Sequence, residues 1–403
     1  MNSLREGFKE AMREPVLIRE ASIEAVVHRP NGGFLTVPAS PPGAAALALA
    51  AALLLVGGGC AAINRQVDHW ALEMKAEKVL GQQLTWRPGV ELPYRTSAEL
   101  ERLTRPTGLP EVQIAPLRVH RQRDSMLIQE EVSFTSAIPL RLPESRVARA
   151  YVFRHGAWGE RPVLLWVPGQ NVSSADFLSL DRFFARALER GVDIVFFVPP
   201  YHLERTPQGY GSGDAFLATD FVDHLNAFAQ ELHDLRSLTA WIRAQGVREL
   251  GAFGSSMGGT MVLRLISWEP LFDFVTAMQP VIDWNALIRR PEMAPVRRRL
   301  AGQGVSDEDV MLVYHAIDPR TGTLQISPAR LSLLYGRFDL IAPEGPILAL
   351  KRRWGIKRVK VYDRGHAFIT MGSRPFIDFG RSLDVDLTAL RWRRFLESLG
   401  PWR

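Results

Sequence analysis

Residues 250–266 read LGAFGSSMGGTMVLRLI, and this stretch decides the fold. The apolar run LGAFG predicts a buried strand, and MGGTMVLRLI has the apolar spacing of a helix. Between them, Gly254 and Gly258 flank Ser256 in the pattern G-x-S-x-G. A strand that turns sharply into a helix presents the middle residue at the sheet edge, and glycines are needed where side chains would clash. The setting therefore predicts Ser256 as a nucleophile, with the Met257 N–H facing the developing oxyanion.

Strand-like and helix-like segments alternate on both sides of this stretch. Continuously apolar strands separated by helices are typical of a mostly parallel sheet with helices on both faces. Right-handed crossovers place the carboxyl ends of such strands at one edge, where ligand sites lie. We therefore expect an α/β domain over residues 126–400. Its predicted parallel strands lie within RPVLLWVPG (161–169), VDIVFFVPP (192–200), VRELGAFG (247–254), FDFVTAMQPVI (272–282), ARLSLLYGRFD (329–339) and KRVKVYDRG (357–365).

Two more residues fall at the carboxyl ends of predicted strands, after Ser256 in the chain. Asp339 ends the segment GRFD, and His366 follows the last predicted strand. A serine hydroxyl is a poor nucleophile until a base accepts its proton. His366 would accept that proton, and Asp339 would hold the imidazole in the useful tautomer. Asp363 is the competing acid, and His202 the competing base.

This order of serine, aspartate and histidine resembles the α/β-hydrolase superfamily of esterases, lipases, thioesterases and peptidases. The resemblance covers roughly residues 130–400. It implies a second oxyanion donor in the loop Pro168-Gly169-Gln170-Asn171, where Gly169 matches the glycine of the family. The Gln170 N–H is the expected donor and Asn171 the alternative. Pro168 departs from the usual histidine.

The resemblance also implies a small helical cap over the site, at about residues 284–326, with arginines on its outer face. The segment Pro199-Pro200-Tyr201-His202 follows a core strand, so we expect Tyr201, His202 and the nearby Asn171 to line the substrate pocket. The sequence has no H-E-x-x-H motif and no P-loop. It therefore predicts no metal, no cofactor and no nucleotide.

A long apolar run precedes the α/β domain. No charged residue occurs between Arg29 and Arg65, and residues 44–63 read AAALALAAALLLVGGGCAAI. Twenty residues at about 1.5 Å each span about 30 Å, the thickness of a bilayer core. Three interpretations stay open: a membrane anchor, a lipoprotein signal with lipidation at Cys60, and a helix of the globular domain. LVGGGC resembles the bacterial lipobox, with Gly57 in place of the usual leucine. An anchor and a lipidated cysteine predict opposite sides of the membrane.

Composition limits the remaining possibilities. With 403 residues and 46% hydrophobic side chains, the chain can bury a full core, and its single cysteine allows neither an intramolecular disulfide nor a cysteine-based zinc site. We expect an N-terminal extension (1–43), the apolar segment (44–63), a helical lead or linker (64–125), and then the hydrolase domain. The formal charge of +6 is clustered at Arg289-Arg290, Arg297 to Arg299, Lys351 to Arg353, Lys357-Arg358 and Arg391 to Arg394.

These basic clusters fit solvated helix faces, or attraction to anionic lipid head groups or an acidic substrate. No nucleic-acid-binding motif accompanies them, so we expect no nucleic acid partner. The predicted function is a serine hydrolase that cleaves the carboxylic ester of a hydrophobic or lipid-like substrate and associates with the membrane. The alternatives are a catalytically weak binding or sensing protein of the same fold, and an acyltransferase using the same triad.

Overall fold

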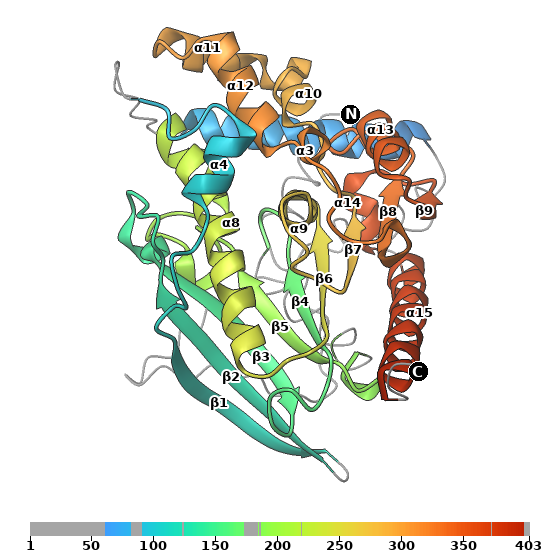
Figure 1. Ribbon diagram of the computed structural model, residues 1–403. Coiled ribbons are helices and arrows are strands. Elements are labelled where there is room, and N and C mark those ends of the chain that lie inside the picture. Colours follow the sequence, from blue (N-terminus) through green and yellow to red (C-terminus); the bar gives the residue numbers. More distant parts are fainter. Residues whose placement is uncertain are drawn as a thin grey trace, which may run out of the picture.

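A nine-stranded sheet forms the centre of the molecule, with strand order β1-β2-β3-β5-β4-β6-β7-β8-β9 (Figure 1). The computed structural model describes residues 61–81, 91–122, 125–172, 184, 187–218, 220–371 and 373–398. The strands are β1 (Gln113–Gln122), β2 (Ser125–Thr135), β3 (Val147–His155), β4 (Val163–Val167), β5 (Asp193–Val198), β6 (Leu250–Ser255), β7 (Phe274–Met278), β8 (Leu331–Gly336) and β9 (Arg358–Tyr362). β4 to β9 pair in parallel, whereas β1, β2 and β3 are antiparallel.

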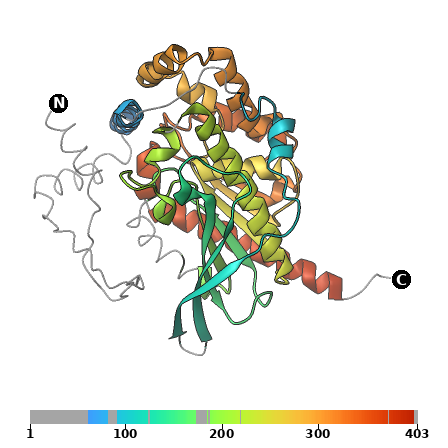
Figure 2. The ribbon, with the colours of Figure 1, turned by 90° about the vertical axis from the view of Figure 1, so that its left-hand side faces the viewer.

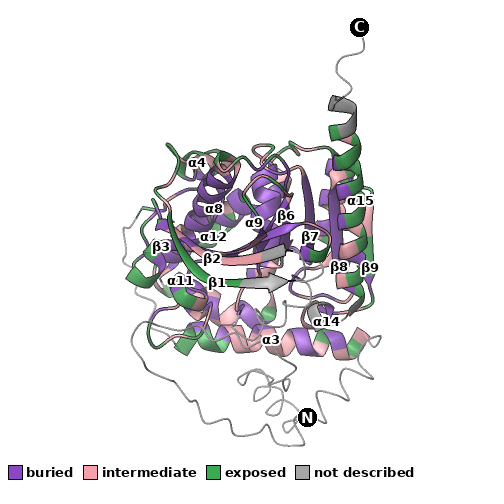
Figure 3. Ribbon diagram, turned by 90° about the horizontal axis from the view of Figure 1, so that it is seen from below, coloured by how far each residue is buried: buried purple, intermediate pink, exposed green. Residues whose placement is uncertain are grey.

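Helices cover both faces of this sheet, which confirms the predicted fold class. α8 (Phe221–Ala244), α9 (Met257–Ile266) and α13 (Glu344–Trp354) share one buried apolar cluster with one face. α15 (Ser373–Ser398) and residues 187–188 share a second cluster with the other face. Every residue of β4 and β5 is buried, as expected of strands covered on both sides. Figure 3 shows the contrast between the neighbouring central strands β6 and β7, which are buried, and the exposed stretch of β1.

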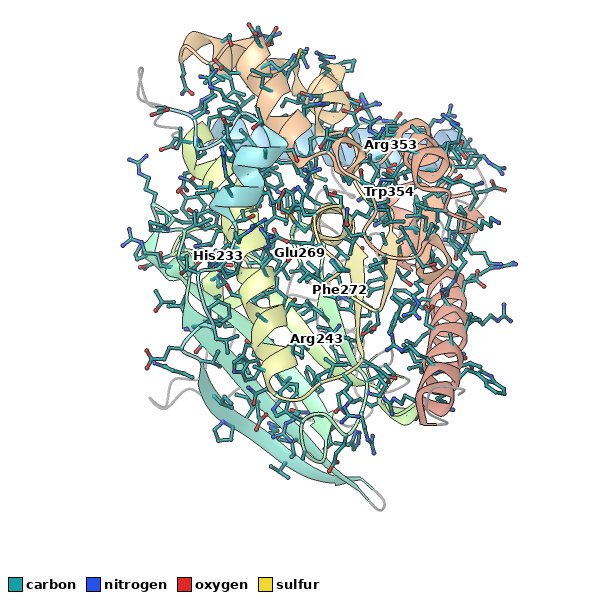
Figure 4. All side chains as sticks on the ribbon, in the orientation of Figure 1. His233, Arg243, Glu269, Phe272, Arg353 and Trp354 are labelled. Atoms are coloured by element: carbon teal, nitrogen blue, oxygen red, sulfur yellow. The ribbon has the colours of Figure 1, made fainter. Side chains whose placement is uncertain are left out.

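Polar side chains fix α8 against the sheet connections. Arg243, at the end of α8, donates to the carbonyl oxygen of Leu271 at 3.2 Å and pairs with Asp273 at 3.1 Å. Arg236 pairs with Glu269, just beyond α9, at 2.5 Å. Arg243 and Glu269 are both seen beside α8 in Figure 4. These contacts hold α8 and α9 in place next to the strand that leads to Ser256.

The segment between β7 and β8 forms the small helical cap, with α10 (Trp284–Ile288), α11 (Ala294–Gly302) and α12 (Asp307–Ile317). Only some of its arginines lie on the outer face, as predicted. Arg289 and Arg298 are exposed. Arg297 is half-buried and donates to the Ile288 carbonyl oxygen at 2.5 Å, and Arg299 donates to that of Leu80 at 2.7 Å. The latter two hold the cap together and join it to the N-terminal helix.

The N-terminal part differs from the predicted helical lead. α3 (Ala61–Gly81) and α4 (Ser97–Leu103) are helices, but residues 113–122 form β1, so the sheet begins before residue 126. β1 and β2 extend as a long hairpin away from the cap (Figure 2). Ile114, Leu117 and Val119 of β1 are exposed. The strand buries no regular apolar face, and Pro116 suits only an edge strand, so the sequence pattern did not reveal it.

The predicted extension (1–43) and most of the apolar segment, Cys60 included, lie outside the described residues. Residues 61–63 of the apolar segment begin α3. Within the described part of the chain, no helix has the length and apolar character needed to cross a membrane. α3 crosses the end of the sheet that carries the cap (Figure 1).

Candidate active site

Ser256 occupies the turn between β6 and α9. Its φ of 52° and ψ of −116° are strained values for a residue with a side chain. The Ser256 N–H donates to the Met278 carbonyl oxygen of β7 at 2.9 Å, and its own carbonyl oxygen accepts from the Thr260 N–H at 3.2 Å. These bonds hold the turn between strand and helix. The local geometry is the one that residues 250–266 predict.

The structure brings the three predicted catalytic side chains together. Ser256 Oγ lies 2.9 Å from His366 Nε2, and His366 Nδ1 lies 2.7 Å from Asp339 Oδ2. Asp339 comes from the loop after β8, and His366 begins α14 (His366–Met371) after β9. Asp363, the competing acid, instead pairs with Arg337 at 2.7 Å on the surface, with 56% of its side chain exposed.

Asp339 is fixed by its surroundings. Its side chain has no exposed surface, and Oδ1 accepts from the N–H groups of Ile341 at 2.8 Å and Ala342 at 2.7 Å. Burial alone would lower the pKa of His366, but the Asp339 carboxylate, its hydrogen bond and the nearby Asp68 carboxylate together raise that pKa above its ordinary value. The imidazole is therefore suited to accept a proton from Ser256.

The loop after β4 approaches the nucleophile closely. A Cβ on Gly169 would lie 2.9 Å from Ser256 Cβ and 3.2 Å from the Ser255 carbonyl oxygen, so a side chain could not fit there without movement. Within the described residues, the Met257 and Gln170 N–H groups donate to no other group. Asn171 N–H instead donates to His202 Nε2 at 2.9 Å, which removes it as the alternative donor.

Tyr201 and His202 do not line a pocket, contrary to the prediction. Both have 0% exposed surface. The Tyr201 hydroxyl donates to Asp223, and His202 Nδ1 bonds the Pro200 carbonyl oxygen at 2.7 Å. Burial lowers the pKa of His202 to about 3. With both ring nitrogens engaged and its pKa so low, His202 supports the Asn171 turn and is not the base.

Sequence reasoning missed the contribution of α3 to this site. Asn64, Asp68 and Lys75 of α3 all reach the loops that carry the site residues, and Lys75 Nζ donates to Gln170 Oε1 at 2.7 Å. These residues are separated by four and then seven positions, which places them on one face of a helix. This spacing is the feature of the sequence from which their common orientation could have been predicted. Among the described residues, no group of three or more His, Cys, Asp or Glu side chains is arranged to hold a metal ion.

No protein-family profile matches the chain. Two curated proteins are similar to it in sequence. Both are described as uncharacterized proteins of Mycobacterium tuberculosis, from strains CDC 1551 and H37Rv, and each is 29% identical over 226 residues. The match covers 51% of this chain and 50% of each relative. The chain thus spans about half the length of the curated relatives it matches.

Solved structures with a similar chain path include two acetyl xylan esterases. The one from Thermoanaerobacterium sp. JW/SL YS485 has a TM-score of 0.49 at 15% identity, over 75% of this chain and 98% of its own. The one from Paenibacillus sp. R4 also has a TM-score of 0.49 at 15% identity, over 73% and 96%. Values this low transfer no activity to the present chain. The fold is instead shown by three features of the chain itself: the strand order of the sheet, the turn at Ser256, and the order of serine, aspartate and histidine along the sequence. Together they show that the chain has the α/β-hydrolase fold.

Proposed function

We propose that this protein is a serine hydrolase that cleaves a carboxylic ester through an acyl-enzyme. The observation that carries the proposal is the hydrogen-bonded series Ser256 Oγ, His366 Nε2, His366 Nδ1 and Asp339 Oδ2, at 2.9 and 2.7 Å. It lies at the carboxyl edge of the sheet, where such sites are found in parallel sheets. The strained turn at Ser256 and the close approach of Gly169 support the same conclusion.

The geometry supports a two-step reaction. Ser256 Oγ attacks the ester carbonyl carbon while its proton passes to His366 Nε2, and Asp339 stabilises the resulting imidazolium. The N–H groups of Met257 and Gln170 stabilise the oxyanion. His366 then gives the proton to the departing alcohol oxygen as the C–O bond breaks, which leaves an acyl-Ser256. Water attacks this ester, its proton passes to His366, and the carboxylic acid leaves as Ser256 is protonated again.

Labelling with a fluorophosphonate probe and hydrolysis of p-nitrophenyl esters test the proposal. We expect the wild-type protein to be labelled and active, and Ser256→Ala to lose both properties with its thermal unfolding unchanged. Ser255→Ala is the matched control, because Ser255 lies one residue away and contacts neither partner of the triad through any described bond; it should keep both. A folded wild-type protein that is never labelled would instead favour the binding or sensing alternative.

A hydrophobic or lipid-like acyl group is the finer part of the proposal. Its support is the apolar segment at 44–63, which leads directly into α3, together with exposed basic residues at the end of the molecule that carries α3 and the cap. They include Arg289, Arg298, Arg352 and Arg353. Ester panels of increasing acyl length, with phospholipid vesicles as a second substrate, should show faster hydrolysis of longer chains. Adding alcohols distinguishes water from another acyl acceptor.

Membrane association is proposed on the same grounds. Membrane fractionation of the full chain, followed by mass analysis of the mature N-terminus, tests it. An intact chain in the membrane fraction supports an anchor, and a chain that begins with a lipidated Cys60 supports a lipoprotein. Complete recovery in the soluble fraction would contradict both.

A further inference from the structure

Two polar side chains of α3, Asn64 and Asp68, are completely buried, with 0% exposed surface. Burying a carboxylate in this way is costly unless hydrogen bonds compensate it. Asp68 Oδ2 accepts from the N–H groups of Leu340 at 3.0 Å and His366 at 2.9 Å, and Oδ1 accepts from that of Ala367 at 3.3 Å. The Asp68 carboxylate thus joins the loop that carries Asp339 to the backbone of His366.

Asn64 extends this connection by one residue. Its Oδ1 accepts from the Gly365 N–H at 2.6 Å. A Cβ on Gly365 would lie 2.9 Å from Asp68 Oδ2 and 3.0 Å from the Asn64 carbonyl oxygen, so only glycine lets α3 come this close. Three successive backbone N–H groups, from Gly365 to Ala367, are therefore bonded by side chains of α3.

Charges on α3 also act on the imidazole of His366. The charged groups that influence it are Asp339, from the loop after β8, and Asp68 and Lys75 from α3. The two carboxylates favour the protonated imidazole, and the Lys75 ammonium opposes it. Burial, the largest effect, and the neighbouring Asp339 carboxylate raise the pKa of Asp68 to about 6, although His366 and the N–H partners of Asp68 oppose this rise. At neutral pH the carboxylate is therefore charged.

We propose that Asp68 is a positioning residue for the base: its carboxylate holds the loops of Asp339 and His366 together, and its charge stabilises the imidazolium that forms during the reaction. This inference rests on the proposed function, because it assigns Asp68 a role relative to His366 as the base. Asp68 accepts no proton in the reaction, since the proton of Ser256 moves to His366 Nε2 and then to the leaving group. α3 is thereby a part of the site, although it comes before the sheet in the chain.

The substitution Asp68→Asn tests this role, because it keeps the size of the side chain but removes the charge and turns one acceptor into a donor. We expect kcat to fall on the order of 10- to 100-fold, with KM changed by less than about 2-fold. We also expect the acidic limb of the kcat/KM profile to move to lower pH, since that limb reports the pKa of the free base. Lys75→Met should move it to higher pH. Glu77→Gln, an exposed change on the same helix, should leave it in place.

The pKa of His366 provides a readout that needs no turnover. It can be followed by NMR of ¹³C-labelled histidine, with the signal assigned by His366→Asn. A lower His366 pKa in folded Asp68→Asn supports the inference even if the wild-type protein proves not to be an esterase. The failure of the proposed function can therefore be distinguished from the failure of this inference. A folded variant with an unchanged His366 pKa and acidic limb overturns the inference. If Asp68→Asn does not fold, Asp68→Ser replaces it in both measurements, and an unchanged kcat and His366 pKa in that folded variant overturn the inference.

Discussion

At the residue scale, the two carboxylates that the sequence offers as the acid partner of His366 have opposite surroundings. Asp339 is buried and bonds the imidazole, whereas Asp363 lies on the surface and pairs with Arg337. Asp339→Asn keeps the shape but cannot hold the imidazole in the same way, so we expect kcat to fall about 10³- to 10⁴-fold. Asp363→Asn is the matched control and should stay within about 2-fold of wild type, because exposed ion pairs contribute little. Steady-state kinetics on p-nitrophenyl esters distinguish the two, and the reverse pattern would refute the assignment of the acid.

Gly169 allows a second test at this scale. Its missing side chain leaves room for Ser256, so Gly169→Ala must displace the loop that carries the Gln170 N–H. Losing one oxyanion donor costs about 10²- to 10³-fold in rate, and we expect a kcat loss of that order. Gly302→Ala, at a glycine of α11 with nothing within 4 Å of the added Cβ, should leave kcat unchanged. Equal rates for both variants would remove Gln170 from the oxyanion site.

The sequence predicted those site residues whose position follows from strand order. Ser256, Asp339 and His366 each follow the carboxyl end of a strand, and parallel strands end at one edge, so their meeting could be expected. The roles of Tyr201 and His202 could not be predicted in this way. Their neighbours in the chain suggested a pocket wall, but hydrogen bonds to Asp223 and the Asn171 turn fix both side chains in the interior.

At the element scale, α3 depends on a few apolar contacts as well as its polar face. Leu72 has 1% exposed surface, whereas Leu80 on the same helix has 37%. Leu72→Ala leaves a cavity and should lower the free energy of unfolding by about 2–5 kcal/mol. Leu80→Ala is the matched control and should cost far less. Urea unfolding followed by circular dichroism measures both, and equal midpoints would show that α3 is not packed as described.

The elements recognised in the sequence were those with a regular apolar pattern. The strands from β4 to β8 are buried on both faces, and their continuous apolar runs reveal them. α3 is also helical, as predicted, but its inner face carries Asn64, Asp68 and Lys75. In the sequence, a polar inner face cannot be distinguished from a solvent-exposed one, so the pattern indicates only a helical lead or linker. β1, with its exposed apolar residues and Pro116, was missed for a related reason.

At the scale of the whole molecule, one buried acid links stability to pH. Glu231 of α8 has 0% exposed surface, and neither carboxylate oxygen has a hydrogen-bond partner among the described residues. The buried pair Arg205 and Asp234 lies close by, with 3.1 Å between Nη2 and Oδ2. Burial raises the pKa of Glu231 from 4.5 to about 8, the Arg205 charge opposes this, and the Asp234 charge adds to it. The folded protein therefore holds a proton on Glu231 at neutral pH that the unfolded chain releases.

This proton makes stability fall as pH rises. The contribution of Glu231 is fully present below pH 4.5, the unfolded value, and is lost progressively up to the folded value of about 8. In this window the folded state binds one more proton, so the free energy of unfolding should decrease by about 1.4 kcal/mol per pH unit from this group. Glu231→Gln keeps the size of the side chain but cannot titrate. The free energy of unfolding of this variant should therefore lack this contribution to the decrease with pH. Urea unfolding at pH 6, 7 and 8 compares the two proteins, with the exposed change Glu77→Gln as control. Parallel slopes in wild type and Glu231→Gln would show that Glu231 is already ionised in the folded protein, because only a protonated carboxyl gives the difference.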